Sequence, residues 1–355
     1  MARTRKPAAD GGVVSTCSYE ARVYGVHSAQ PISLAYRLCP HAVFLPVDGE
    51  KYHKVSEEIF KTLYDFTPDL QPLSIDEAFL DITGSYHLFK TPFVTAQAIK
   101  KRILEKVQLT CSIGLAPNKM VAKIASDFCK PNGLLEIKPD KIFEFLWPLP
   151  VEKLWGVGPK TKTLLSQLGI RTVGDLAKIP LPDLSARFGQ FGKHLYELSH
   201  GIDDRSVETE EEIKSVSHEH TFERDTQNRE EIDEVLLYLS EKVSRRLRKN
   251  DLKGKTLTVK IRLKGFQTYS RAHTFSGRTN FFEDIYHQAK TIFEEFYKKG
   301  TAIRLIGVRL SNFDDPYVRE SLFVLPSNEK KEKIHHAVDL IKDKFGETAI
   351  HRGKG

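Results

Sequence analysis

The sequence has few of the features that mark secreted, metal-stabilised or membrane proteins. Its 355 residues include four cysteines and no CxxC pair, so neither a structural zinc site nor a disulfide framework is expected. No apolar run approaches the roughly 20 residues of a membrane helix. Residues 1–12 are basic but no apolar segment follows them, which excludes a secretory signal. We expect a cytoplasmic protein without internal repeats.

Negative charge is almost absent from one stretch of the chain. Residues 242–278 hold twelve Lys or Arg and a single acid, Asp251, which gives a net charge of +11, whereas the whole chain carries +7. A localised basic surface is typical of proteins that bind a polyanion, most often nucleic acid. A solvated helix and strand face would give the same count, and charge alone does not separate the two interpretations.

Apolar spacing predicts an α/β layer in the first part of the chain. Short strands alternate with helices that have one apolar face, which favours one sheet with helices packed on it. The expected helices are 51–66, 95–107, 118–128 and 140–146, and the expected strands are 73–82, 109–116 and 133–137. Short helices with glycine at their breaks follow in residues 152–205.

A polar, acidic stretch, residues 207–212, is the best candidate for a linker. Beyond it the pattern predicts an α+β unit, an antiparallel sheet with two helices on one face. The helices are expected at 232–247 and 282–297, and the strands at 256–264 and 303–313. In the first strand Leu257, Val259 and Ile261 alternate with polar residues, and the polar face would carry much of the basic charge.

Two adjacent carboxylates, Asp76 and Glu77, stand beside an apolar strand. Neighbours on a regular strand point to opposite faces, so both can reach one metal only at a strand end or turn, which Pro72 permits. Carboxylate oxygens suit Mg²⁺, which takes one or two of them together with substrate phosphates. An edge strand with ordinary surface acids is the alternative.

Three lysines, Lys119, Lys123 and Lys130, lie on the helix that Asn118 can cap and on the loop after it. Lysines near a triphosphate would neutralise its charge. A solvated helix face explains the same spacing.

Residues 154–170 have the pattern of a helix-hairpin-helix. Glycines Gly156 and Gly158 let the backbone approach a phosphate, and the next helix, which Pro159 can open, points free N–H groups at it. Such a hairpin grips nucleic-acid backbone without reading sequence. A plain glycine turn is the alternative, and residues 189–193 could form a second half of the motif.

The segment 15–22, Ser-Thr-Cys-Ser-Tyr-Glu-Ala-Arg, reads as a strand or turn that runs into a helix. Tyr19 and Arg22 would share a helix face, where an arginine fork on a phosphate is conceivable. Packing and a surface salt bridge explain the pattern as well.

The order of these motifs resembles the Y-family of lesion-bypass DNA polymerases, in its bacterial DNA polymerase IV branch. The resemblance runs from about Gly12 to the final helix at 330–350. It implies a multidomain α/β and α+β right hand with a ferredoxin-like palm and a helix-hairpin-helix thumb. It implies a disordered tail at 1–11, fingers at 12–48, palm at 49–150, thumb at 152–206, linker at 207–212, little finger at 213–325, and a C-terminal helix and tail at 326–355.

The resemblance also implies roles for single residues. Asp76 would bind Mg²⁺, and Glu77 would be its catalytic neighbour and also touch metal, in a two-ion site. The residues implied to contact the incoming deoxynucleoside triphosphate are Thr16, Tyr19, Arg22 and Lys130. Those implied to contact primer-template DNA are Gly156, Gly158, Lys160, Lys255, Arg271 and Arg304.

The family pattern begins with a strand that carries a metal-binding Asp and, further on, an aromatic that rejects ribonucleotides. We expect both to be missing here, because the chain opens after that point of the pattern. Either the natural start lies upstream, or the chain is a truncated remnant that binds DNA or a sliding clamp without catalysis. A palm-fold nucleotide cyclase is disfavoured, since it explains neither the hairpin nor the basic stretch. Leu322 and Phe323 form a degenerate clamp-binding tail, and a monomer is expected.

Overall fold

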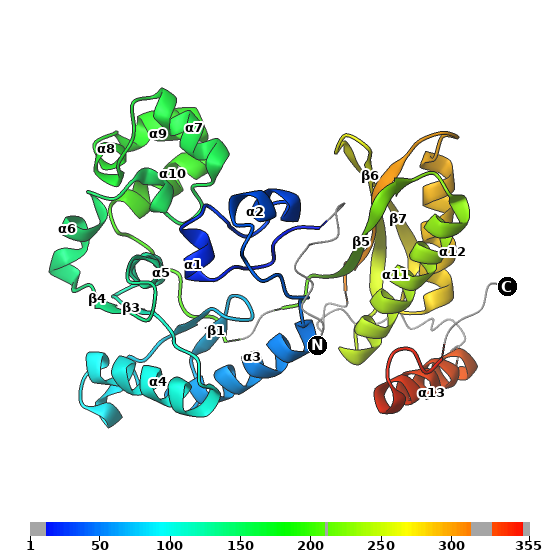
Figure 1. The fold of residues 1–355 in the computed structure, drawn as a ribbon, viewed down its shortest axis with the longest axis horizontal. Helices are drawn as coiled ribbons and strands as arrows, with labels where there is room; N and C mark the ends of the chain where they lie inside the picture. Colours follow the sequence, from blue (N-terminus) through cyan, green and yellow to red (C-terminus); the bar gives the residue numbers. More distant parts are fainter. Residues whose placement is uncertain (1–11, 210–211, 314–328, 351–355) are drawn as a thin grey trace. The chain divides into compact units, whose positions relative to one another are not determined.

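The computed structural model describes residues 12–209, 212–313 and 329–350. The chain divides into two compact units, one formed by Val47–Glu211 and the other by Met1–Pro46 with Glu212–Gly355. Figure 1 labels helices and strands of both units. None of the helices in the described part of the chain has the length and apolar character needed to span a bilayer.

The first part of the Val47–Glu211 unit alternates helices with short strands, as expected. Its helices begin at side-chain caps: Asp48, Thr91 and Asn118 each accept a hydrogen bond from a first-turn N–H group. A buried apolar cluster that includes Leu63 and Leu70 joins the first two helices to the hairpin. The elements are α3 (Gly49–Leu63), β1 (Leu70–Pro72), β2 (Ala78–Leu80), η1 (Tyr86–Phe89), α4 (Pro92–Val107), β3 (Ile113–Leu115), α5 (Lys119–Phe128) and β4 (Leu134–Glu136).

The strands of this part differ from the expected single sheet. The strand predicted over residues 73–82 is instead a turn followed by the short strand β2, because the Leu73 N–H donates to the Glu77 carbonyl at 2.8 Å and closes a hairpin with β1. Among the described residues, β1 and β2 form one antiparallel pair and β3 and β4 form a separate parallel pair. The prediction of one continuous sheet is therefore wrong for these residues.

The second part of this unit is a cluster of short helices. Pro159 stands in the first turn of α7 and Gly169 follows its end at φ +77°, as the sequence predicts. Gly192 of α10 lies so close to α9 that a Cβ there would be 2.1 Å from the Leu184 carbonyl oxygen. The elements are η2 (Pro139–Lys141), α6 (Ile142–Leu146), η3 (Val151–Lys153), α7 (Pro159–Gln167), α8 (Val173–Ala177), α9 (Leu181–Phe188) and α10 (Gln190–Ser199).

The other unit contains an antiparallel sheet of four strands in the order β5-β8-β6-β7. The side chains of Leu257, Val259 and Ile261 on β6 are fully buried against α11 and α12, as the alternation predicts. The two edge strands, β5 and β7, were not predicted. The elements are β5 (Ser215–Thr226), α11 (Arg229–Lys249), β6 (Gly254–Leu263), β7 (Thr268–Thr279), α12 (Phe282–Phe296), β8 (Ile303–Ser311) and α13 (Glu329–Phe345).

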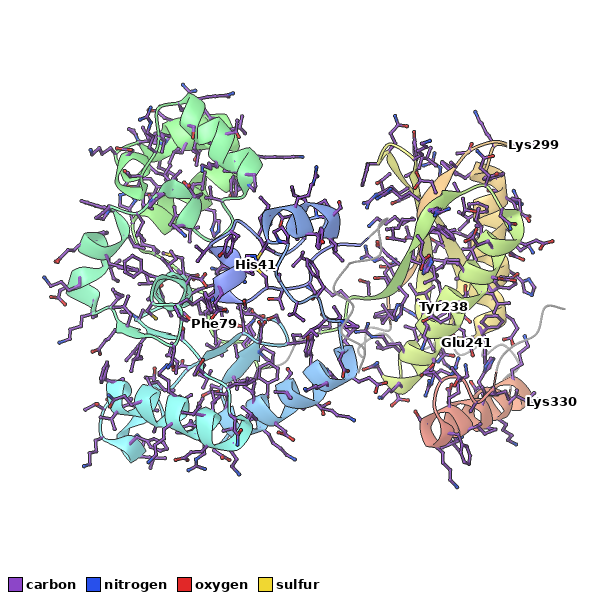
Figure 2. All side chains as sticks on the ribbon, viewed as in Figure 1. His41, Phe79, Tyr238, Glu241, Lys299 and Lys330 are labelled. Atoms are coloured by element: carbon purple, nitrogen blue, oxygen red, sulfur yellow. The ribbon has the colours of Figure 1, made fainter. Side chains whose placement is uncertain are left out.

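Helix α13 is attached to α11 by charge. Lys342 of α13 is 5% exposed and pairs with Glu241, which Figure 2 labels on α11. His335 is buried and lies 3.0 Å from Glu283 of α12. The apolar residues Ile334 and Phe345 remain more than half exposed. Further pairs include Arg248–Asp339, Arg245–Asp343, Lys242–Glu347 and Lys253–Glu332.

These pairs correct the interpretation of the basic stretch. Four of its twelve cations are neutralised by acids on α13 or just after it. Lys260 and Arg262, in contrast, alternate with the buried residues of β6 and point to the face that the helices leave open. The +11 stretch is therefore not one surface.

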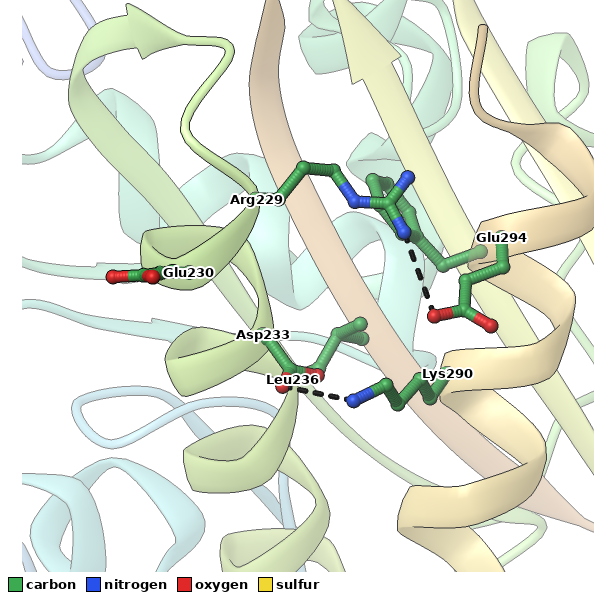
Figure 3. Close-up of a pocket in the computed structure, with 7 residues that line it drawn as sticks. Arg229, Glu230, Asp233, Leu236, Lys290 and Glu294 are labelled. Carbon is green, nitrogen blue, oxygen red and sulfur yellow. Dashed lines mark hydrogen bonds and ion pairs between the residues drawn. The ribbon is translucent and has the colours of Figure 1, made fainter. Parts of the chain in front are cut away.

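A hollow between α11 and α12 is crossed by two ion pairs, Arg229–Glu294 at 3.4 Å and Asp233–Lys290 at 3.0 Å (Figure 3). Tyr286 also donates to Asp233, at 2.9 Å. Four of the charged residues that line the hollow therefore pair with one another and tie the two helices together.

Residues 12–46 hold two short helices, α1 (Tyr19–Arg22) and α2 (Ile32–Leu38). The Ser18 hydroxyl accepts a hydrogen bond from the Ala21 N–H and caps α1. Val26, Ala35 and Cys39 form a small buried cluster that holds the segment together.

Candidate active site

The two adjacent carboxylates lie in the turn between β1 and β2. Such a turn is the arrangement in which neighbouring side chains can reach one site. Asp76 is exposed, and its Oδ1 accepts a hydrogen bond from the Ser74 hydroxyl at 2.6 Å. Glu77 is partly buried, and its carbonyl closes the turn.

One face of α5 continues from this turn as a row of alternating charges. The Lys123 ammonium lies 3.0 Å from Glu77 Oε2. Asp127 is four residues further along the helix, so it shares the face of Lys123, and it pairs with Lys130 at 2.6 Å. The order Glu77, Lys123, Asp127, Lys130 places carboxylates suited to a cation at one end and a lysine suited to a phosphate at the other.

Lys119 does not belong to this row. Its side chain is buried, and its ammonium donates to Gln71 Oε1 at 2.6 Å and to the Ser206 carbonyl at 2.8 Å. It also lies 5.2 Å from the ring of Phe79, which Figure 2 labels. Burial, and then the charge of Arg205, lower the pKa of Lys119. Lys119 therefore fits neither a triphosphate contact nor a solvated helix face, because its buried ammonium joins β1 to the segment after α10.

That segment also holds the start of α5. Asp203 Oδ2 accepts the Met120 N–H at 2.9 Å, and Arg205 both binds Asp203 at 2.6 Å and lies 4.5 Å from the Trp155 ring. Burial pushes the pKa of Asp203 up, but the hydrogen bond and charge of Arg205 outweigh burial and hold this pKa below its usual range. Nothing in the local sequence indicated these contacts.

We expect Asp203→Ala to destabilise the Val47–Glu211 unit by about 3 kcal/mol, because a carboxylate whose side chain is 2% exposed loses a charged partner and a helix N–H. Urea unfolding measures this loss, with exposed Asp204→Ala as the control. A lowered pKa stabilises the fold above the ordinary carboxyl pKa, so the difference between the variants should shrink in acid. Equal midpoints for the two variants at neutral pH would contradict this assignment.

The donors in the turn fit a hard cation in chemistry and number. Mg²⁺ is usually bound by one or two carboxylates, with water and substrate phosphates filling the other positions. Asp76 and Glu77 supply two such carboxylates, each oriented by one neighbour. Within residues 12–209, 212–313 and 329–350, no group of three or more His, Cys, Asp or Glu side chains comes together.

The glycine hairpin lies between η3 and α7. Gly156 has φ +96°, a conformation that side-chain-bearing residues rarely adopt, and Gly158 is the N-cap of α7. Lys160, in the first turn, is exposed. The free N–H groups of this helix start are accessible to a phosphate. The second glycine turn lies between α9 and α10, where Gly189 has φ +58°.

Three of the residues implied to contact a triphosphate lie in the other unit. Thr16, Tyr19 and Arg22 are all exposed, and the Arg22 guanidinium lies 5.7 Å from the Tyr19 ring. The shared helix face predicted for Tyr19 and Arg22 is therefore present in α1.

One of the implied DNA contacts of the sheet, Arg271, lies on the side that the helices cover. Arg271 pairs in register with buried Val259, and opposed residues project to the same face, so Arg271 lies on the helix side, 5.6 Å from the Phe296 ring. Arg304 lies 4.3 Å from the Phe266 ring and 3.4 Å from Asp225. Lys255 is partly buried next to the last pair of β6 and β8.

The open face of the sheet carries cations of β6, as the alternation along this strand predicts. Lys260 reaches Glu219 at 2.9 Å across β8, where Gly307 has no side chain to separate them. A Cβ at residue 307 would lie 2.8 Å from Glu219. Arg262 and Arg309 lie on the same face. Alternation along β6 predicted Arg262, and the same alternation along β8 could have indicated Arg309. Leu322 and Phe323, the expected clamp tail, lie outside the described residues.

Three family models match the chain: the impB/mucB/samB family over residues 2–127, the C-terminal domain of the same family over residues 213–322, and the IMS family HHH motif over residues 139–170. A DNA polymerase IV of Desulfatibacillum aliphaticivorans is 41% identical over 346 residues, which cover 97% of this chain and 87% of that protein. The chain belongs to the DNA polymerase IV group of the Y-family.

Other relatives and solved structures agree with membership of this family. A DNA polymerase IV of Methanoculleus marisnigri is 45% identical, with 89% of this chain and 87% of that protein covered. A Y-family DNA polymerase chimera, Dbh-Dpo4(243-245)-Dbh, has a TM-score of 0.75 at 28% identity, covering 87% of this chain and 89% of the chimera. DinB from Sulfolobus solfataricus has a TM-score of 0.56 at 28% identity, covering 85% and 88%. The expected Y-family fold is confirmed.

Proposed function

We propose that this chain is a template-directed DNA polymerase of the lesion-bypass type. The observation that carries the proposal is the Asp76–Glu77 turn against the charged face of α5, in a chain that belongs to the DNA polymerase IV group. A chain that only bound DNA would have no use for two adjacent carboxylates in a turn beside a row of alternating charges.

The reaction is the attack of a primer 3′-hydroxyl on the α-phosphate of a deoxynucleoside triphosphate, with release of pyrophosphate. Asp76 and Glu77 would hold Mg²⁺, which when bound stabilises charge on the attacking and leaving oxygens. The Ser74 hydroxyl orients the carboxylate of Asp76, and the Lys123 ammonium orients that of Glu77. Lys130, with Thr16, Tyr19 and Arg22, is proposed to contact the triphosphate.

We assign primer-template contacts to the hairpin and the sheet. Backbone N–H groups at Gly156 and Gly158, with the Lys160 side chain, would bind phosphates. Lys255, Arg271 and Arg304 are the proposed cations of the sheet, and the open face adds Lys260, Arg262 and Arg309. The proposed divisions are fingers 12–48, palm 49–150, thumb 152–206, linker 207–212 and little finger 213–325.

The remaining proposals concern partners and location. A sliding clamp is a proposed partner through Leu322 and Phe323, and the polymerase is proposed to act as a cytoplasmic monomer. DNA binding is expected to weaken steeply with salt and to vary little with sequence, because the assigned contacts are to phosphates.

The test is primer extension by the full chain with Mg²⁺ and all four deoxynucleotides, on an undamaged template and on one with a single abasic site. Duplex binding is measured in parallel by fluorescence anisotropy. We expect extension on both templates. Tight duplex binding without extension would contradict the polymerase assignment.

The second candidate is a DNA-binding protein without catalysis. One observation favours it: the described residues bring only two adjacent carboxylates to the turn and no third acid. The same experiment decides between the two functions, because this candidate predicts salt-sensitive binding and no extension under any metal concentration.

A further inference from the structure

A lysine outside the proposed site holds the loop that follows α5. The Lys100 ammonium, on α4, donates to Asn132 Oδ1 at 2.8 Å, to the Asn132 carbonyl at 3.1 Å and to the Gly133 carbonyl at 3.1 Å. It also donates to the Cys111 carbonyl, just before β3. Four oxygens thus converge on one ammonium ion, which has three N–H donors.

The loop around this ammonium has an uncommon backbone conformation and is closely packed. Asn132 has φ +51°, which is an uncommon conformation for a residue with a side chain. A Cβ at Gly133 would lie 2.0 Å from the Cys129 carbonyl oxygen, so the loop passes against the end of α5. The Gly133 N–H donates to the Ser112 hydroxyl at 3.3 Å. Without a cation at their centre, the four oxygens would repel one another and the loop would relax.

Lys130 stands at the start of the same loop, two residues before Asn132. Its ammonium binds Asp127, which shares a helix face with Lys123 and so with the carboxylate turn. A shift of the loop would therefore change the position of the Lys130 backbone relative to this row.

We propose that Lys100 is a positioning residue for nucleotide binding: its ammonium occupies a cage of four oxygens and thereby fixes the loop from which Lys130 reaches the triphosphate. This inference rests on the proposed function, because it takes Lys130 as a triphosphate contact. Lys100 itself contacts neither the turn nor the proposed metal ligands, and it acts only through Lys130.

The variant is Lys100→Met, which keeps an unbranched chain and removes the charge and all donors. The control is Lys101→Met, the adjacent position, whose side chain is 79% exposed and only weakly paired with Glu105. We expect Lys100→Met to raise the KM for the incoming nucleotide about tenfold with kcat changed less than about threefold, which is the pattern of lost substrate binding. Lys101→Met should behave as the wild type.

A double-mutant cycle separates positioning from loss of stability. In a Lys130→Ala background the loop has no triphosphate contact to position, so Lys100→Met should raise the KM no further. Multiplying effects of the two substitutions would overturn the inference, because they would show that Lys100 acts independently of Lys130.

Chemical rescue supplies a second readout. In Lys100→Ala the cage loses its cation, and ethylammonium is expected to restore part of the nucleotide affinity, whereas tetramethylammonium, which has no N–H donor, should not. Equal effects of the two salts on nucleotide affinity, at the same ionic strength, would contradict the proposal that the four oxygens bind an N–H donor. If Lys100→Met fails to fold, Lys100→Arg replaces it in the double-mutant cycle, since a planar guanidinium group does not match a cage of four oxygens.

Binding of a fluorescent deoxynucleotide is measured for every variant alongside extension. No extension by the wild type would contradict the proposed function, and the cycle would then be read in nucleotide affinity. Extension by the wild type with the same KM in Lys100→Met and Lys101→Met would overturn the inference alone.

Discussion

Asp76→Asn or Glu77→Gln is expected to reduce kcat/KM for primer extension by about 10³-fold or more, which corresponds to several kcal/mol of lost charge stabilisation. Each substitution keeps the size of the side chain and removes the negative charge that a hard cation requires. Ser74 donates to Asp76, and Lys123 binds Glu77. Because these contacts orient the two side chains, we attribute the expected loss of activity to the missing negative charge. Single-turnover extension with saturating DNA measures it.

The matched control is Asp81→Asn, at the other end of the same hairpin. Asp81 Oδ1 accepts the Thr83 N–H at 2.9 Å, and an asparagine oxygen can do the same. This control should retain most of the activity and the duplex affinity. Activity that survives in Asp76→Asn or in Glu77→Gln, or that is lost equally in Asp81→Asn, would show that the turn is not where the cation acts.

Gly114→Ala is expected to destabilise the Val47–Glu211 unit by about 3 kcal/mol, the upper end of the usual range for overpacking. Gly114 lies on β3 directly against α5, and a Cβ there would be 2.0 Å from the Ala122 carbonyl oxygen and 2.5 Å from the Ser126 nitrogen. Both are backbone atoms, so the strand must move away from the helix. Urea and thermal unfolding measure the loss.

Gly84→Ala is the control for this substitution, because a Cβ at Gly84 meets nothing within 4 Å. It should leave the unfolding midpoint almost unchanged. Since α5 carries Lys123, we also expect any folded Gly114→Ala protein to extend primers poorly while still binding duplex through the other unit. Unchanged stability of Gly114→Ala would contradict the close contact between β3 and α5.

Local sequence signals predicted the helices better than the strands. Asn118 begins α5 and Pro159 begins α7 because caps and proline act within one turn of the backbone. The edge strands β5 and β7 escaped prediction because an open face accepts polar residues, which leaves few apolar positions to alternate. The Leu73–Glu77 turn was not predicted, because the local apolar pattern favoured one continuous strand over residues 73–82.

The sequence predicted only those residues of the candidate site that lie close together in the chain. Asp76 and Glu77 are neighbours in sequence, and Lys130 follows a recognisable helix, so these residues stood out. Asp203 binds the start of α5 and Lys100 binds the loop after it, both from distant segments. No local pattern marks a lysine or an aspartate that binds backbone groups. The burial of Lys119 likewise depends on the segment that contains Ser206.

The strand order β5-β8-β6-β7 sets the sequence of events during synthesis. Strand β8 lies between β5 and β6, so the first strand of the sheet cannot pair until the last one, Ile303–Ser311, has left the ribosome. Until then β6 and β7 can pair only with each other, and the backbone groups of β5 have no neighbouring strand. Domains emerge and fold in order as they are made, but this one can close only after β8 has been made. If translation stalls before residue 303, the nascent chain would therefore expose unpaired strands of this sheet, to which chaperones can bind.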